Sequence, residues 1–377
     1  MKPVYLDCNA TTPIATEVFE EMKPFFLEEF GNEGSRTHEF GTRAKKAIQK
    51  AREQVASVLN AKPEEVIFTS GATESNNIAL LGLRKEGIEK NRKHIITSMI
   101  EHKAILEPCD YLEREGFEVT RLTATRGGVF NIDALKESLR PDTLLVSLMQ
   151  VNNETGIRQP IDQVTEILKE HPAYFHTDAA QGFGKDINTL RNPRIDLISI
   201  SGHKIYAPKG IGALITRRRG YDRLPLESIV FGGGQERGLR PGTLPVALIV
   251  GLGKSAEVAE RDEEKRKITC KKIKTEALSA LKKLNPKITG DESLMMDHVL
   301  SLAIPGLDSE ALMVGLKDLI AISNGSACTS ASYAPSHVLL AMGLSEDEAN
   351  ECVRISWSFM TPQIDWEEIA KKIRKMI

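Results

Sequence analysis

The feature that most constrains the fold is a regular alternation of short apolar segments and helical segments between residues 66 and 201. Strands are expected at 66–69, 94–97, 117–122, 143–149, 174–177 and 195–200, with helices between most of them. This alternation indicates a mostly parallel sheet covered by helices. Ligands of such sheets bind at the carboxyl ends of the strands, so the residues after each strand are the candidates for a functional site.

Further helices and strands are expected before and after the alternating region in the sequence. Helices are expected at 16–29, with Val18, Met22, Phe25 and Phe26 on one face, and at 38–60. A long helix at 245–284 follows the alternating region. The tail shows strands at 298–304, 319–322 and 353–356, a loop at 323–335, and helices at 309–316, 336–342 and from 366. We interpret residues 255–377 as a smaller α/β domain.

Composition excludes several classes of protein. The chain has 377 residues with 41% hydrophobic and 27% charged side chains, as in ordinary globular proteins. The net charge of −2 does not favour direct binding to nucleic acid or to an anionic membrane. No signal peptide and no transmembrane run is expected. Five scattered cysteines without a C-x-x-C pair favour free thiols in a reducing, cytoplasmic setting.

The strand at 195–200 leads into Ser201, Gly202, His203 and Lys204. A lysine at the end of a buried strand is well placed to form a Schiff base, because burial lowers its pKa and makes the amine nucleophilic. Taken alone, the same pattern also fits an ordinary solvated lysine.

Other strand ends add complementary groups. Small residues at 70–73, which include Ala72 and Thr73, begin a helix and can present N–H groups to a phosphate, or they form an ordinary helix cap. His102 follows the strand near 94–99 and can stack on a planar ligand or move a proton; the alternative is a surface histidine. Asp178 can hold a pyridine nitrogen protonated, or it can cap a helix.

Side-chain amides follow the strand at 143–149. Asn152 and Asn153 could orient a ring or a carboxylate there, or form an asparagine-rich turn. Together with the lysine, the histidine and the aspartate, these groups compose a site for pyridoxal 5′-phosphate. The histidines show no metal-ligand spacing, so no metal is expected.

A second centre is the run of small polar residues at 323–332, which holds Cys328. Such a loop should be exposed and mobile, and an accessible thiol there suits a nucleophile that works between two sites. The alternative is a tolerated surface cysteine. Cys109, Cys270 and Cys352 lie in strand or helical contexts and are interpreted as structural; Cys8 is less certain, because it lies beside the turn at 9–12.

The chain resembles the NifS/IscS-type cysteine desulfurases, which are fold-type I enzymes that use pyridoxal phosphate. The resemblance covers essentially the whole chain and is carried by residues 5–7, 10–13, 69–75, 101–103, 151–154, 201–206, 240–245 and 325–330. It implies a mixed, mostly parallel seven-stranded sheet in a large domain, 13–254. Residues 1–12 and 255–377 would form the small domain that carries the catalytic cysteine loop at 323–335.

The resemblance also implies roles for the matching residues. Catalysis would fall to Lys204 as the Schiff-base lysine, His102 for stacking and proton transfer, and Cys328, which would accept the sulfur of L-cysteine as a persulfide and release L-alanine. The implied cofactor-binding residues are Ala72, Thr73, His102, Asn153, Asp178, Gln181, Ser201, His203, Lys204 and Thr243. Thr243 would reach in from the second subunit of a homodimer. Asn153 and Arg354 would bind the substrate, Arg354 at its carboxylate.

Within this family, residues 6–12, 34–41, 322–325 and 354–357 resemble the desulfurases of DNA phosphorothioation (Dnd) systems. Such enzymes supply sulfur through an iron–sulfur partner protein, whose cluster Cys328 could transiently ligate, without touching DNA. The chain ends about twenty residues after Arg354, without the longer tail that housekeeping relatives use to dock a scaffold protein, and this puts scaffold binding in doubt.

Other functions stay open from the sequence. The chain could be a general desulfurase for iron–sulfur clusters or tRNA thiolation, or another pyridoxal phosphate enzyme such as a selenocysteine lyase or an aminotransferase. A non-catalytic thiol-bearing scaffold for sulfur is the alternative from a different class.

Overall fold

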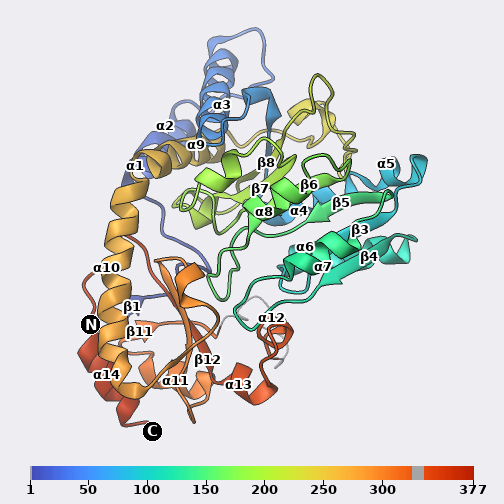
Figure 1. Ribbon diagram of the computed structural model, residues 1–377. Coiled ribbons are helices and arrows are strands. Elements are labelled where there is room, and N and C mark those ends of the chain that lie inside the picture. The colour runs from blue at the N-terminus through green and yellow to red at the C-terminus, as the bar shows by residue number, and fades with distance from the viewer. Residues whose placement is uncertain (1, 325–334) are drawn as a thin grey trace.

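The computed structural model describes residues 2–324 and 335–377 (Figure 1). Its strands are β1 (Val4–Tyr5), β2 (Val66–Thr69), β3 (His94–Ser98), β4 (Glu118–Leu122), β5 (Thr143–Ser147), β6 (Tyr174–Asp178), β7 (Leu197–Ser201), β8 (Gly212–Thr216), β9 (Lys287–Ile288), β10 (Val299–Ala303), β11 (Ile320–Ala321) and β12 (Cys352–Ser356). Its α-helices are α1 (Thr16–Met22), α2 (Pro24–Leu27), α3 (Glu39–Val58), α4 (Ala72–Leu81), α5 (Arg84–Glu89), α6 (Lys103–Arg114), α7 (Ile132–Ser138), α8 (Ile161–Ile167), α9 (Val246–Arg261), α10 (Glu263–Leu281), α11 (Ser309–Leu316), α12 (His337–Ala341), α13 (Glu346–Asn350) and α14 (Trp366–Arg374).

Within the described part of the chain, the large sheet has seven strands in the order β2-β8-β7-β6-β5-β3-β4. Strand β8 is antiparallel to both of its neighbours, and the other neighbouring pairs are parallel. The predicted α/β fold with a mixed, mostly parallel seven-stranded sheet is therefore confirmed. The carboxyl ends of β2, β3, β5, β6 and β7 meet at one end of this sheet, where the reversed strand β8 begins.

Alternating side chains of the large sheet enter two apolar cores, one on each face. Phe68 and Ile198 pack with residues of α3 and α9 on one face, whereas Ile67 and Leu197 pack with residues of α4 and α6 on the other. Successive strand residues point to opposite faces, so near-continuous apolar strands are what a sheet covered on both faces requires.

The C-terminal region forms a second core around the antiparallel sheet β12-β10-β9. Leu6, from the N-terminal segment, packs there with Trp357 and with residues of α10 and α14. Figure 1 shows α10 running down from the large sheet toward this region, where both chain termini also lie. The domain boundaries at 12/13 and 254/255 remain predictions.

Three predicted helices are interrupted. The helix expected at 16–29 breaks before Pro24, which lacks an amide hydrogen, and Phe26, predicted on its buried face, is 55% exposed. The helix that follows the small residues at 70–73, expected to run through about Arg84, ends at Leu81. The chain turns at Gly82, where an added Cβ would lie 2.3 Å from the Ile78 carbonyl oxygen.

The long helix expected at 245–284 is divided into α9 and α10 at Asp262, whose φ of −106° and ψ of 10° depart from helical values. This turn redirects the chain from the large sheet to the second core. No helix in the described ranges has the length and apolar character needed to cross a membrane.

Candidate active site

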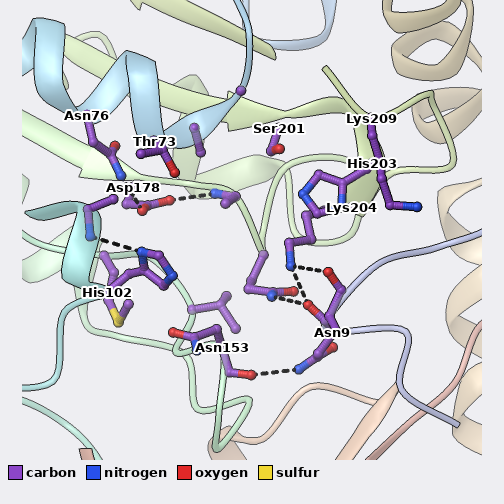
Figure 2. Close-up of a pocket in the computed structure, with 18 of the residues that line it drawn as sticks. Asn9, Thr73, Asn76, His102, Asn153, Asp178, Ser201, His203, Lys204 and Lys209 are labelled. Carbon is purple, nitrogen blue, oxygen red and sulfur yellow. Dashed lines mark hydrogen bonds between the residues drawn. The ribbon is translucent and has the colours of Figure 1, made fainter. Parts of the chain in front are cut away.

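A cavity of about 500 Å³ opens at the end of the large sheet where the parallel strands finish (Figure 2). Most of the predicted site residues line it: Ala72, Thr73, His102, Asn153, Asp178, Gln181, Ser201, His203, Lys204 and Arg354. They come from five strand ends of the large sheet and from β12 of the C-terminal region, so the fold gathers groups that lie up to 282 residues apart in sequence, from Ala72 to Arg354.

Lys204 lies in the turn directly after β7, and its amine projects into the cavity (Figure 2). Nζ donates hydrogen bonds to the backbone carbonyl oxygens of Asn9 and Ala10, the latter at 2.8 Å. These carbonyls belong to the N-terminal segment after β1, so that segment closes one side of the cavity. The amine is thus held at the position expected for a Schiff-base lysine.

The N-terminus of α4 forms one wall of the cavity. Gly71, the residue before α4, has a φ of 156°, which glycine adopts without a Cβ penalty. Ala72 and Thr73, the first two residues of the helix, line the cavity together with Ser201 and His203. Burial and the nearby lysines lower the pKa of His203 to about 4, so its ring is neutral at pH 7. This donor set fits the phosphate group of the cofactor.

Lys209 adds a cationic group to the cavity that the sequence analysis missed. It lies in the connection between β7 and β8, which returns along the end of the sheet where the parallel strands finish. The reversal of β8 places it there. The signal in the sequence was its position five residues after Lys204, just before the glycines that begin β8.

Asp178, at the end of β6, is held in a fixed orientation. Oδ2 accepts a hydrogen bond from Nδ2 of Asn76 at 2.7 Å, and Oδ1 accepts one from the Ala180 N–H at 2.9 Å. The carboxylate is 6% exposed and lines the cavity, as a partner of a pyridine nitrogen should. Asn76 was also missed, although it lies one turn after Thr73 on the same helix.

Among the described residues that line the cavity, four have a buried side-chain amide oxygen without a hydrogen-bond donor: Asn9, Asn76, Asn153 and Gln181. Nε2 of Gln181 is already used, because it donates to the Asn9 carbonyl at 2.9 Å. A buried acceptor without a donor is costly, so these oxygens fit a ligand that carries N–H or O–H groups. A ring hydroxyl beside Gln181 is such a group.

His102 caps helix α6 and faces the cavity (Figure 2). Nδ1 accepts a hydrogen bond from the Ala104 N–H at 3.1 Å, so the proton of the neutral ring is on Nε2. The preceding residue, Glu101, is completely buried, and burial raises the pKa of its carboxyl to about 8. Oε1 of Glu101 accepts from Ser98 Oγ at 2.7 Å and from Met149 N at 2.9 Å.

Arg354 brings a buried guanidinium from β12 to the cavity. Nη2 contacts Oδ1 of Asp7 at 2.7 Å, and Nη1 donates to the Asn153 carbonyl at 2.9 Å. Nε is buried without an acceptor in the described part of the chain. This arrangement fits the binding of a substrate carboxylate, because a guanidinium can still donate to a further acceptor.

Two predicted site residues do not join this group. Thr243 is exposed, in the segment between β8 and α9, and does not line the cavity. Its predicted role belongs to a second subunit and stays a prediction. Cys328 lies outside the described residues.

The described residues on either side of that segment are anchored beside the cavity. Ser323 exchanges backbone hydrogen bonds with Arg354, at 3.2 and 2.6 Å. After the segment, the Ser336 hydroxyl donates to Glu154, and Nε2 of His337 contacts the Glu101 carbonyl oxygen at 2.9 Å. Both anchors are therefore next to residues that line the cavity.

The four described cysteines are all buried and unpaired. Burial raises the pKa of Cys8 to about 11 and those of Cys109 and Cys270 to about 12, and it also raises that of Cys352. None of these thiols is activated as a nucleophile, since a reactive cysteine needs a lowered pKa and access. Within the described ranges, no group of three or more metal-binding side chains is found.

Comparisons with known proteins agree with this geometry. The sequence matches the family model of the class-V aminotransferases over residues 4–369. A cysteine desulfurase from Homo sapiens is 43% identical over 379 residues, covering 100% of this chain and 81% of that protein. The solved structure of DndA from Streptomyces lividans has 49% identity and a TM-score of 0.83, with 94% of this chain and 99% of that chain covered. A NifS-like protein has 36% identity and a TM-score of 0.91, with 99% of both chains covered.

These similarities confirm the resemblance drawn from the sequence motifs, including the likeness to the Dnd desulfurase. Class-V aminotransferases depend on pyridoxal phosphate, which confirms the predicted cofactor, and the cavity residues described above fit it. With a match from residue 4 to residue 369, the chain belongs to the aminotransferase class-V family.

Proposed function

We propose that the chain is a pyridoxal phosphate-dependent cysteine desulfurase that converts L-cysteine to L-alanine and transfers the sulfur to Cys328. The observation that carries this proposal is the cavity in which Lys204, Asp178 and Arg354 converge. The lysine and the aspartate suit the cofactor, and the arginine suits an amino-acid carboxylate. A curated relative with 43% identity is named a cysteine desulfurase.

The geometry of the cavity supports the following assignment of the cofactor-binding residues. Ala72, Thr73, Ser201 and His203 hold the phosphate, with Thr243 of the second subunit completing it in a homodimer. Asp178 holds the ring nitrogen protonated, and Gln181 binds the ring hydroxyl through its free oxygen. When bound, the cofactor supplies an electron sink for the α-carbon of the amino acid.

The substrate is bound and deprotonated by residues of this chain. Arg354 binds the carboxylate of L-cysteine, and Asn153 contacts the substrate through its unpaired side-chain oxygen. Lys204 would hold the cofactor covalently through Nζ, and its amine, when free, would move the α-proton of the substrate. His102 stacks on the ring and assists proton transfer at Nε2.

The sulfur transfer is balanced without a further reagent. The Cys328 thiolate attacks the substrate sulfur, the carbon–sulfur bond breaks with its electrons remaining on carbon, and that carbon takes up a proton. The products are L-alanine and a persulfide on Cys328. Burial raises the pKa of each of the four described cysteines, which supports this assignment, as do the anchors of residues 323 and 336–337 beside the cavity.

The process that receives the sulfur is a more specific part of the proposal. The 49% identity with DndA supports sulfur supply for DNA phosphorothioation through an iron–sulfur acceptor protein, whose cluster Cys328 could transiently ligate. The net charge of −2 favours no direct contact with nucleic acid. A general role in iron–sulfur cluster assembly is the second candidate, because a relative named IscS, from Vibrio vulnificus, is 44% identical. The proposed location is the cytoplasm.

The test is a product assay with the purified holoenzyme and L-cysteine. Equal amounts of alanine and sulfide are expected in the presence of a thiol reductant, which releases the persulfide sulfur. Keto-acid formation, or absence of both products, would contradict the proposed function. The acceptor can be identified by trapping the persulfide-bearing enzyme with candidate iron–sulfur proteins, and DNA-modification proteins among the partners would separate the two pathways.

A further inference from the structure

We propose that Asn9 is a substrate-binding residue, whose side-chain oxygen Oδ1 accepts a hydrogen bond from the α-amino group of the incoming amino acid. This inference rests on the proposed function. Asn9 follows β1 and is 2% exposed. Figure 2 shows it at the wall of the cavity, between Lys204 and Asn153.

The orientation of the Asn9 amide is fixed by its partner. Nδ2 lies 3.1 Å from the backbone carbonyl oxygen of Asn153, which can only accept a hydrogen bond. The nitrogen must therefore face that carbonyl, and Oδ1 is directed elsewhere. Oδ1 is buried and has no donor among the residues that the structure describes.

The backbone of Asn9 is held just as firmly. Its N–H donates to Ser356 Oγ at 2.9 Å, and its carbonyl accepts from Gln181 at 2.9 Å and from the amine of Lys204. Asn9 thus connects the lysine, the predicted ring-hydroxyl partner and the β12 strand. A side chain so fixed, with one acceptor left over in a cavity, is prepared for a ligand that brings a donor.

The position of Arg354 indicates which donor that is. The Asn153 carbonyl accepts from both Asn9 Nδ2 and Arg354 Nη1, so the Asn9 amide and the guanidinium are neighbours. When Arg354 binds the carboxylate of an amino acid, the α-amino group of that amino acid lies near Asn9 and Lys204, because only the α-carbon separates the two groups. The α-amino group of the substrate must come close to Lys204 to take its place on the cofactor. The thiol of the substrate must stay accessible to Cys328.

The test compares two ligands of the holoenzyme by calorimetry. L-Alanine has the α-amino group, and 3-mercaptopropionate has the carboxylate and the thiol without it. In Asn9→Ala, the Kd for L-alanine should rise about tenfold, and that for 3-mercaptopropionate should change less than about twofold. Asn188→Ala, at an exposed position outside the cavity, should leave both unchanged.

Equal weakening of both ligands, or of neither, would overturn the proposal. Asn9→Ser, whose side chain is too short to reach the same position, should likewise weaken the binding of L-alanine but not that of 3-mercaptopropionate. If both variants lose the cofactor absorbance, Asn9 is structural and the proposal is also overturned. The readout is independent of desulfuration, so a wild-type enzyme that makes no alanine from L-cysteine would contradict the proposed function while leaving this test interpretable.

Discussion

Asn76 donates a hydrogen bond from Nδ2 to Oδ2 of Asp178 at 2.7 Å, and this contact joins helix α4 to the end of β6. Both residues are buried at the cavity. The helix whose N-terminus is proposed to bind the phosphate therefore also orients the carboxylate that is proposed to face the ring nitrogen. One element thus links the proposed phosphate site at residues 72–73 to the Asp178 carboxylate.

The first prediction concerns Asp178. Asp178→Asn removes the negative charge that holds the ring nitrogen protonated, so alanine formation should fall at least about 100-fold. Cofactor binding, measured by absorbance, should persist because the phosphate site is untouched. Asp347→Asn, on the exposed side of α13, is the control and should keep wild-type activity. Activity within a few fold of wild type in Asp178→Asn would show that the carboxylate has no such role.

The second prediction concerns Lys204. Lys204→Ala removes the amine at the end of β7, so the Schiff-base absorbance near about 400 nm should disappear and turnover should fall at least about 1,000-fold. Lys169→Ala, at an exposed position, should retain both properties. An intact absorbance band in Lys204→Ala would mean that another lysine binds the cofactor, and Lys209 would be the first to examine.

The third prediction concerns Arg354. A lysine at this position keeps the charge but cannot donate hydrogen bonds to Asp7, the Asn153 carbonyl and a substrate carboxylate at the same time. Arg354→Lys should raise the KM for L-cysteine about tenfold or more, with a smaller effect on kcat. Urea denaturation should show a loss of about 1–3 kcal/mol, because buried groups lose their partners. An unchanged KM would show that Arg354 does not bind the substrate carboxylate.

The fourth prediction concerns the pH dependence of stability. Burial raises the pKa of Glu101 from 4.5 to about 8, so the folded protein keeps this proton after the unfolded chain has lost it. Between these two pH values the unfolded state binds fewer protons, so this group's contribution to the free energy of unfolding falls as pH rises. The slope is about 1.4 kcal/mol per pH unit.

Glu101→Gln is the matched variant, because glutamine keeps the acceptor for Ser98 and Met149 but does not titrate. The unfolding free energy of the wild type, minus that of Glu101→Gln, should fall steadily from pH 5 to pH 8. Urea denaturation at several pH values measures it. A difference independent of pH would mean that Glu101 is ionised throughout.

The sequence predicted the features that have local signals. Apolar runs and turn residues predicted β2 and α11 to the residue, and the residues after the strands identified Lys204, Asp178 and His102 as neighbours. Periodicity was less informative where a helix changes direction. The break before Pro24 has a local cause, the missing amide hydrogen of proline. The break at Asp262 depends on how the chain packs against the two cores, which the apolar pattern of α9 and α10 alone does not contain.

The missed site residues depend on tertiary contacts. Asn76 and Lys209 lie on elements whose positions follow from the strand order, in particular from the reversal of β8. Asn9 reaches the cavity because β1 pairs with β11, more than three hundred residues later. Glu101 was adjacent to a predicted residue, but only its burial makes it distinctive.

The central claim is that Cys328 accepts the sulfur, and the most direct test is to measure alanine and sulfide from L-cysteine with Cys328→Ala. The cofactor absorbance should be unchanged, because the residues proposed to bind the cofactor lie elsewhere in the chain. Formation of both products should fall at least about 100-fold. Cys352→Ala, which removes a buried thiol with a raised pKa, should keep the folded variant active. Alanine and sulfide production by Cys328→Ala at the wild-type rate would contradict the account.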